Sequence, residues 1–361
     1  MTQNQAFEIV RDEDLALYAD FDSRNLGAGI ERASVDVLPT VDLSPFFEDA
    51  DEASRERAAQ QLRRACIDVG FFYMKGHPFS REECDLLMSW GKRFFALPRE
   101  EKKKWPFAPG RGFLDGAVGG DPNKPVDVKE RLLFPPQWAM NEAEQQGAYP
   151  HDPYAWPADS VLPGFRAFID DFNFKTIKAA QRIGWAISRS LGLDESHLER
   201  AQGRFGSAIV YNYYPPMDPT HIERAQWSFS PHSDFGSFNM LLQDSVNALQ
   251  VRNAAGRWVD IPPVEGTLIV NIGNLTARAT NDLYPSALHR VANTNGKERL
   301  SVSMFAGAPF SAVVKCLETC ESATNPARYP PITAGDYVLA LLKHANMNGT
   351  VAVAADNNRF R

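Results

Sequence analysis

Eight short apolar runs, separated by turn residues, follow one another between residues 205 and 308 and limit the folds open to this chain. Each run is rich in β-branched and aromatic residues, and successive runs lie roughly ten residues apart, as in all-β sandwiches and barrels. Two facing sheets of eight strands in total make a jelly roll. The runs cover residues 208–214, 227–231, 237–242, 249–252, 258–261, 267–272, 287–291 and 300–305. We therefore predict a mainly β fold with helices, built around a jelly-roll core.

The residues before this core have helical periodicity. Apolar side chains recur at helical spacing over residues 52–69, 81–95 and 164–191. Short strands are predicted at 37–42 and 71–74, a loop-rich stretch at 97–136, and a last helix at 335–344. The Gly-rich part of that stretch, residues 110–120, is expected to form a mobile loop over a pocket. We divide the chain into an N-terminal extension (1–34), a mixed helical part packed on the core (35–204), the jelly-roll core (205–308) and a C-terminal segment with a helix (309–361).

Charge and composition limit the kinds of partner that the protein is expected to bind. The formal net charge is −7, and the basic run at 99–104 (REEKKK) contains two glutamates, which predicts an exposed helix face rather than a nucleic-acid site. No apolar run approaches the ~18 residues that span a membrane. Four cysteines are too few for a disulfide framework, and the polar N-terminus has no secretory signal. We expect a cytoplasmic protein that acts on a small molecule; its oligomeric state is left open, and a monomer is compatible with the sequence.

Metal-ligating residue types stand at three positions of the predicted core. His232 and Asp234 are two residues apart, so on a strand their side chains would point the same way. A third candidate, His289, lies on a later run. Two histidines and one carboxylate on one side of a metal, with open positions opposite, form the ligand set of non-haem Fe(II) oxygenases. Each piece alone also fits an ordinary surface pair or a core histidine.

Two further pairs predict an anion site. Arg299 and Ser301 share one face of a strand, and a guanidinium beside a hydroxyl binds carboxylates well. Burying such an arginine without a partner would be costly, and the alternative is an edge-strand arginine at the surface. Asn212 and Tyr214 share a face of the first run. A buried tyrosine hydroxyl needs a partner, which a bound carboxylate would supply; the alternative is simple core packing.

The chain resembles the isopenicillin-N-synthase-like group of Fe(II)/2-oxoglutarate-dependent oxygenases from about residue 36 to residue 345. The core segments that carry the likeness are NYYPP (212–216), PHSDFGSFNMLLQD (231–244), RWVDIPPVEGTLIVNIGN (257–274), SALHRV (286–291) and RLSVSMF (299–305). Upstream, VDLSPF (41–46) and DVGFFYMKGH (68–77) are also similar to the family. Three positions depart from its usual residues without affecting a ligand: Ala248, Asn274 and Pro285.

The resemblance implies a double-stranded β-helix core flanked by helices, with Fe(II) on His232, Asp234 and His289. It also implies that the cosubstrate 2-oxoglutarate binds through its distal carboxylate to Arg299, Ser301 and Tyr214, with Asn212 near its metal-binding end. The expected activity is oxidation of a small organic molecule by O₂, through hydroxylation, desaturation or cyclisation. Decarboxylation of 2-oxoglutarate to succinate would accompany it.

The substrate pocket is expected to be partly apolar. Its candidate residues are Arg111, Phe113, Phe229, Phe238, Phe305 and Phe310, although core packing explains each aromatic ring equally well. Two other kinds of enzyme share these motifs: oxidases that use O₂ without 2-oxoglutarate, and enzymes that fragment 2-oxoglutarate to ethylene. A non-catalytic binding protein is disfavoured because it has no need for an open-sided metal.

Overall fold

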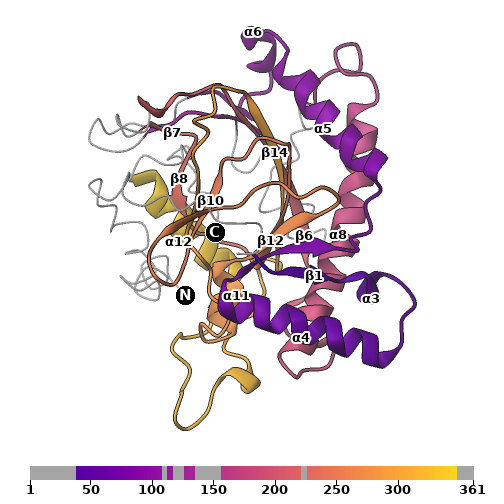
Figure 1. The fold of residues 1–361 in the computed structure, drawn as a ribbon, viewed down its shortest axis with the longest axis vertical. Coiled ribbons are helices and arrows are strands. Elements are labelled where there is room, and N and C mark those ends of the chain that lie inside the picture. The colour runs from indigo at the N-terminus through magenta and orange to yellow at the C-terminus, as the bar shows by residue number, and fades with distance from the viewer. Residues whose placement is uncertain (1–37, 108–111, 117–125, 135–155, 221–225, 348–361) are drawn as a thin grey trace.

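Two β-sheets face each other, and helices cover the outer surface of the larger one (Figure 1). The structure is a computed structural model that describes residues 38–107, 112–116, 126–134, 156–220 and 226–347. The larger sheet has the order β1 (Thr40–Asp42), β2 (Phe71–Lys75), β12 (Leu268–Ile272), β9 (Phe238–Gln243), β14 (Arg299–Gly307), β6 (Gly206–Tyr214), β5 (Glu130–Leu133) and β3 (Gly112–Leu114). The smaller has the order β11 (Trp258–Asp260), β10 (Leu249–Arg252), β13 (His289–Val291) and β8 (Phe229–His232).

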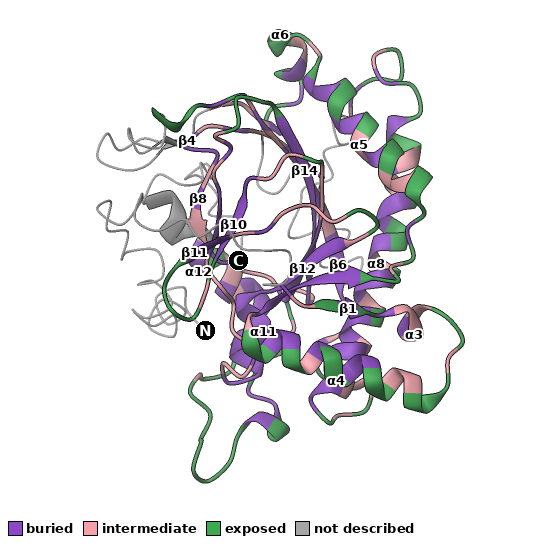
Figure 2. Ribbon diagram, viewed as in Figure 1, coloured by how far each residue is buried: buried purple, intermediate pink, exposed green. Residues whose placement is uncertain are grey.

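Three long helices, α4 (Glu52–Asp68), α5 (Arg81–Phe95) and α8 (Phe165–Ser190), pack against the larger sheet. The other helices are α3 (Ser44–Phe47), α6 (Arg99–Lys102), α9 (His197–Gln202), α11 (Asn274–Ala279) and α12 (Ala334–Met347). Figure 2 shows α4, α5 and α8 with exposed outer faces and buried inner ones. Gly91 of α5 permits a close approach, because a Cβ there would lie 2.6 Å from the Tyr211 ring of β6. The Tyr211 hydroxyl donates to the Leu87 carbonyl at 3.0 Å, which fixes the helix on the sheet.

Local sequence explains where these helices begin. Ser80 and Glu83 form a capping box at the start of α5, in which each side chain accepts a hydrogen bond from the other residue's backbone N–H. The Asp51 side chain accepts from the Ser54 N–H at the start of α4. The helix predictions at 52–69, 81–95 and 164–191 are therefore confirmed to within one residue at each end.

Two strand registers position the residues of interest. β14 pairs antiparallel with β6 over nine residue pairs, which place Arg299 opposite Tyr214 and Ser301 opposite Asn212. In the smaller sheet β13 pairs with β8, and His289 lies opposite His232. Side chains directly opposite each other on antiparallel strands share a face. Both pairs of strands therefore present their polar residues to the space between the sheets.

The jelly-roll prediction is confirmed, because every apolar run after residue 205 contains a strand. The run at 227–231 is divided between β7 (Gln226–Trp227) and β8, and β7 pairs with β4 (Val126–Asp127). Two short strands, β15 (Val313–Val314) and β16 (Ile332–Thr333), and a 3₁₀ turn at Glu318–Cys320 precede α12. All four cysteines have free thiols. Within the described part of the chain, no helix is long and apolar enough to cross a membrane.

The loop predicted over 97–136 is wrong in part. β3 and β5 lie within it and extend the larger sheet beyond β6. They are too short for a clear periodicity, and their extended conformation depends on pairing, of β5 with β6 and of β3 with β5. The exposed face predicted for 99–104 is also wrong at Lys102, which is 5% exposed and pairs with Glu130 at 2.5 Å. The N-terminal extension and most of the Gly-rich stretch lie outside the described residues.

Candidate metal centre and anion pocket

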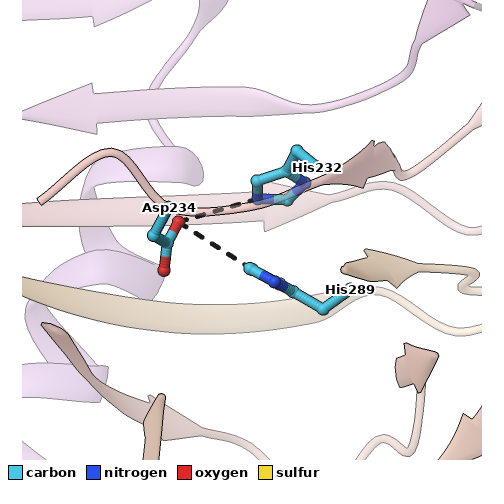
Figure 3. A group of neighbouring side chains, drawn as sticks. All are labelled: His232, Asp234 and His289. Atoms are coloured by element: carbon cyan, nitrogen blue, oxygen red, sulfur yellow. Dashed lines mark ion pairs between the residues drawn. The ribbon is translucent and has the colours of Figure 1, made fainter. Parts of the chain in front are cut away.

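His232, Asp234 and His289 converge between the two sheets (Figure 3). The Nε2 atoms of His232 and His289 lie 3.9 and 3.8 Å from the same carboxylate oxygen, Asp234 Oδ1. His232 is the last residue of β8 and His289 the first of β13, and their rings are 4.2 Å apart. Asp234 lies beyond the end of β8, outside any strand. The three residues could hold a metal ion, since one ligand atom from each lies within 4.8 Å of the others.

The other ring nitrogen of each histidine faces a backbone carbonyl. His232 Nδ1 is 2.8 Å from the Ser230 oxygen, and His289 Nδ1 is 3.2 Å from the Ala287 oxygen. A carbonyl only accepts, so Nδ1 carries the hydrogen and Nε2 presents its lone pair. Burial lowers the pKa of His232 well below its usual range and keeps the ring neutral. Neutral imidazoles held through their second nitrogen are typical metal ligands.

A hydrogen bond on the side away from the histidines fixes the orientation of the Asp234 carboxylate. Asn271 on β12 donates from Nδ2 to Asp234 Oδ2 at 2.8 Å, which leaves Oδ1 toward the histidines. The Asp234 carbonyl accepts from the Asn274 N–H at 2.8 Å. Gly273 makes this approach possible, because a Cβ there would lie 2.3 Å from the Gly236 carbonyl oxygen. The donor set and its hydrogen bonds fit Fe(II), which accepts two imidazoles and one carboxylate.

Arg299 provides a positive charge in the same cavity. It is 1% exposed, and its guanidinium donates to the Val246 carbonyl (3.2 Å), the Gln243 side-chain oxygen (2.9 Å) and Ser301 Oγ (3.4 Å). All of these acceptors are uncharged, and none of the described carboxylates forms an ion pair with it. A buried guanidinium without a counter-charge is unfavourable. The arrangement therefore favours an anionic ligand.

Two polar residues of β6, Tyr214 and Asn212, lie beside Arg299 in the cavity. The Tyr214 ring lies 5.1 Å from Arg299 Cζ, and burial raises the pKa of its hydroxyl, which stays protonated. Asn212 donates weakly to Ser303 Oγ at 3.4 Å. The cavity between the sheets is lined by the three candidate metal ligands, these anion-site residues and a set of mainly apolar side chains: Phe71, Phe229, Leu241, Leu249, Val291, Phe305, Asn239, Asn271 and Ser303. Its empty volume is about 420 Å³, open solvent at the mouth included.

Residues 205–308 match the 2OG-Fe(II) oxygenase superfamily, and residues 38–159 match the non-haem dioxygenase in morphine synthesis N-terminal family. The 2-oxoglutarate-Fe(II) type oxidoreductase hxnY of Emericella nidulans is 32% identical over 320 residues, which are 85% of this chain and 90% of that protein. The chain belongs to the 2OG-Fe(II) oxygenase superfamily. It is a non-haem Fe(II)- and 2-oxoglutarate-dependent dioxygenase, as the sequence predicted.

Solved structures of other proteins share the fold of this oxygenase. JOX2, crystallised with 2OG, Fe and JA, is 26% identical with a TM-score of 0.70, covering 90% of this chain and 92% of its own. A full-length Neurospora crassa protein, crystallised with alpha-KG and 5-formyluracil, has a TM-score of 0.73 at 25% identity and covers 89% of this chain and 97% of its own. The fold class and the cofactors Fe(II) and 2-oxoglutarate are thereby confirmed for this oxygenase.

The residues predicted to contact substrate are distributed in several places. Phe229 and Phe305 line the cavity of the oxygenase, and the Phe229 ring stacks on His232 at 3.9 Å. Phe113 and Phe238 instead pack in the main hydrophobic core, beside Phe94 and Phe205 respectively. The Phe310 carbonyl accepts a hydrogen bond from the Gly335 N–H at 2.9 Å, and Arg111 lies outside the described residues. Substrate contact by these residues stays a prediction.

The sequence did not single out several residues that lie near the candidate metal centre of the oxygenase. Asn271 orients Asp234, and the Phe71 and His289 rings form a T-shaped contact with their centres 5.3 Å apart. Lys129 and Arg131, beside and on β5, lie near the Phe229 ring. A polar residue that interrupts an apolar strand (LIVNI) is the feature by which the sequence could have indicated Asn271, whereas Arg131 follows two charged residues and has no such signal.

Proposed function

We propose that His232, Asp234 and His289 hold the Fe(II) of this dioxygenase and that Arg299 anchors 2-oxoglutarate beside it. The oxidised substrate would be a small organic molecule that enters the cavity between the sheets. The reaction outcome, whether hydroxylation, desaturation or cyclisation, depends on that substrate. Succinate and CO₂ would be the products from the cosubstrate.

One observation carries this proposal: a buried guanidinium without a counter-charge lies in the same cavity as a His-Asp-His cluster of which Asp234 and His289 are buried and His232 is partly buried. Arg299 and Ser301 start β14, whereas the cluster belongs to β8, β13 and the segment just after β8. Both groups line one cavity. A dicarboxylic keto acid fits such a pair of sites, because one carboxylate meets the arginine while the keto-acid end reaches the metal.

Bound Fe(II) would supply the activation of O₂, and the protein's residues orient and shield the reacting groups. Arg299 and Ser301 bind the distal carboxylate, and the protonated Tyr214 hydroxyl is placed to donate a further hydrogen bond to it. Asn271 holds Asp234 Oδ2, so that only Oδ1 faces the two histidines. Phe229 stacks on His232 and Phe71 makes a T-shaped contact with His289, and both rings shield the centre from water.

The size and lining of the cavity support a small organic substrate. Phe229 and Phe305 give it apolar walls, and mixed apolar and polar walls are typical of small-molecule sites. The Neurospora crassa protein of the same fold was crystallised with the small molecule 5-formyluracil. We extend only this broad class, small organic molecules, to the present chain as part of the proposal.

A coupled assay tests the proposal. Purified enzyme with Fe(II), ascorbate and 2-oxoglutarate is incubated with a metabolite library, and succinate is measured against substrate consumed. We expect one succinate per substrate oxidised, and no oxidation when 2-oxoglutarate is omitted. Oxidation that proceeds without succinate would overturn the assignment of the Arg299 site to 2-oxoglutarate. Asp234→Ala should abolish both signals while the protein stays folded.

A further inference from the structure

A second guanidinium, that of Arg131, lies beside the cavity, next to its lining residues Asn212 and Phe229 and on the strand next to the edge of the larger sheet. Arg131 on β5 lies opposite Asn212 on β6, which itself lies opposite Ser301 on β14. Residues in register on adjacent antiparallel strands share a face, and Asn212 and Ser301 both line the cavity. The Arg131 side chain therefore points to the same side. Its Cζ is 5.7 Å from the centre of the cavity-lining Phe229 ring.

Arg131 has little to bind in the protein itself. Its Nε donates to the side-chain oxygen of Asn212 at 3.1 Å. Among the described residues, no acceptor bonds its two terminal nitrogens and no carboxylate pairs with it. A neighbouring acid, Asp127, is occupied by Lys129 at 2.7 Å and by the backbone N–H of Ser230 at 2.8 Å. Arginine stays charged even when burial lowers its pKa, so the charge needs another partner.

The charges of the loaded centre do not supply that partner. Fe(II) and Arg299 together would balance Asp234 and the two carboxylates of 2-oxoglutarate, and the Lys129–Asp127 pair is neutral in itself. The positive charge of Arg131 is therefore not compensated. Since an uncompensated charge in a partly buried site is unfavourable, the missing group must come with the remaining ligand, the substrate.

We propose that Arg131 binds an anionic group, a carboxylate, on the primary substrate, with the apolar part of that substrate against Phe229. This inference rests on the proposed function, because it assumes that Arg299 and the metal take the two ends of 2-oxoglutarate. Arg131 lies beside the Phe229 ring on a strand separate from the clamp at Arg299, and a guanidinium binds carboxylates through paired hydrogen bonds. The substrate class is therefore small carboxylic acids with an apolar body.

A matched pair of probes tests the charge requirement without turnover. Phenylacetate and phenylacetamide have the same apolar body and differ in charge. Each is titrated by calorimetry into enzyme loaded with redox-inert Zn(II) and saturating 2-oxoglutarate, which occupies the Arg299 site. We expect phenylacetate to bind at least about tenfold more tightly than phenylacetamide, as for a charge-assisted hydrogen-bonded pair.

Three variants assign this preference to Arg131. Arg131→Gln should bind the two probes equally, and Arg131→Lys should keep part of the preference. Arg252→Gln, the same change at an exposed arginine of β10, should behave as wild type. Circular dichroism checks that the variants are folded. The affinity of Arg131→Gln for 2-oxoglutarate is a second control and should lie within about twofold of wild type.

The outcomes separate this inference from the proposed function. Equal binding of the two probes by wild type, binding of neither, or a preference that survives Arg131→Gln overturns the carboxylate assignment. A loss of 2-oxoglutarate affinity in Arg131→Gln also overturns it, because Arg131 would then serve the cosubstrate. If wild type with Zn(II) does not bind 2-oxoglutarate at all, the proposed function fails, and the inference built on it fails too.

Discussion

Asn271 donates a hydrogen bond from Nδ2 to Oδ2 of Asp234 at 2.8 Å, across from the space where the two histidines meet. Asp234 lies past the end of β8, so strand geometry does not determine where its carboxylate points. The amide of Asn271, held within the larger sheet on β12, does so instead. We infer that the metal affinity of this chain depends on a residue that touches no metal.

Asn271→Ala is expected to weaken Fe(II) binding by roughly 10- to 100-fold, the usual effect of removing a group that orients a metal ligand. The carboxylate would then rotate, because neither of its oxygens would be held in place. Anaerobic titration of Fe(II) against a chelator measures the affinity. The fold should persist, because the variant removes one buried amide and leaves the strand pairing of β12 unchanged.

Asn239→Ala is the matched control for that variant. Asn239 lies opposite Asn271 on the neighbouring strand β9, is similarly buried and also lines the cavity. The hydrogen bond to Asp234 Oδ2 comes from Asn271 instead. We expect near-normal Fe(II) affinity in this variant. A similar loss in both variants would mean that cavity polarity, rather than the bond to Asp234, determines metal binding.

His232→Ala is expected to abolish Fe(II) retention and turnover and to leave the fold intact. Its ring is neutral and lies at the end of β8, where removing it costs packing against Phe229 but breaks no strand pairing. Metal content after gel filtration and circular dichroism measure the two expectations. His77→Ala, which lies in the loop after β2 and away from the cavity, should retain one Fe(II). Stoichiometric iron in His232→Ala would disprove the ligand assignment.

The sequence predicted those parts of the centre that local pattern determines. His232, His289, Arg299 and Tyr214 are on strands whose alternation is visible, and their registers bring them to one cavity. Asp234 was expected on a strand or at its end, and it follows the strand by two residues. Asp234 lies near the two histidines for a reason other than alternation: Gly273 lets the segment 234–236 approach the start of α11, where the Asn274 N–H bonds the Asp234 carbonyl.

Asn271 and Arg131 could not be assigned from local pattern, because their roles arise from pairing between distant segments. β5 has four residues and becomes a strand only beside β6, whose paired residues lie about eighty positions later in the chain. Asn271 interrupts an apolar run and Arg131 stands just before one, and a sequence cannot tell whether such a residue faces a ligand, a partner side chain or solvent. The strand register in the folded sheet decides which of these each residue faces.

Arg299→Leu should separate ligand binding from stability. The wild-type guanidinium is buried without a counter-charge, so an apolar side chain should leave the unliganded protein equally or more stable. Affinity for 2-oxoglutarate should fall by roughly 100-fold or more, because a charge-assisted clamp is lost. Thermal unfolding with and without 2-oxoglutarate and Zn(II) measures both.

Wild type should gain a rise in Tm from 2-oxoglutarate, as expected for a ligand that binds only the folded state. The Leu variant should gain none, and Arg299→Lys should gain an intermediate rise because it keeps the charge but loses the paired geometry. An unchanged rise in the Leu variant would place the cosubstrate elsewhere.

Tyr73 should make the free energy of unfolding fall at high pH. Its hydroxyl donates to the Pro262 carbonyl at 2.5 Å, and burial raises its pKa from 10.0 to about 12. Because the folded state holds the proton more tightly than the unfolded chain, this stabilisation is complete below pH 10 and is lost as the pH rises through 12.

Tyr73→Phe removes both that hydrogen bond and the titration. At pH 8 the variant should be less stable than wild type by about 1 kcal/mol. By pH 11 wild type should have lost roughly 1 kcal/mol from this group, so that the two unfolding free energies converge. Urea denaturation at the two pH values measures the difference, and a stability gap that stays constant between them would show that Tyr73 does not titrate with the fold.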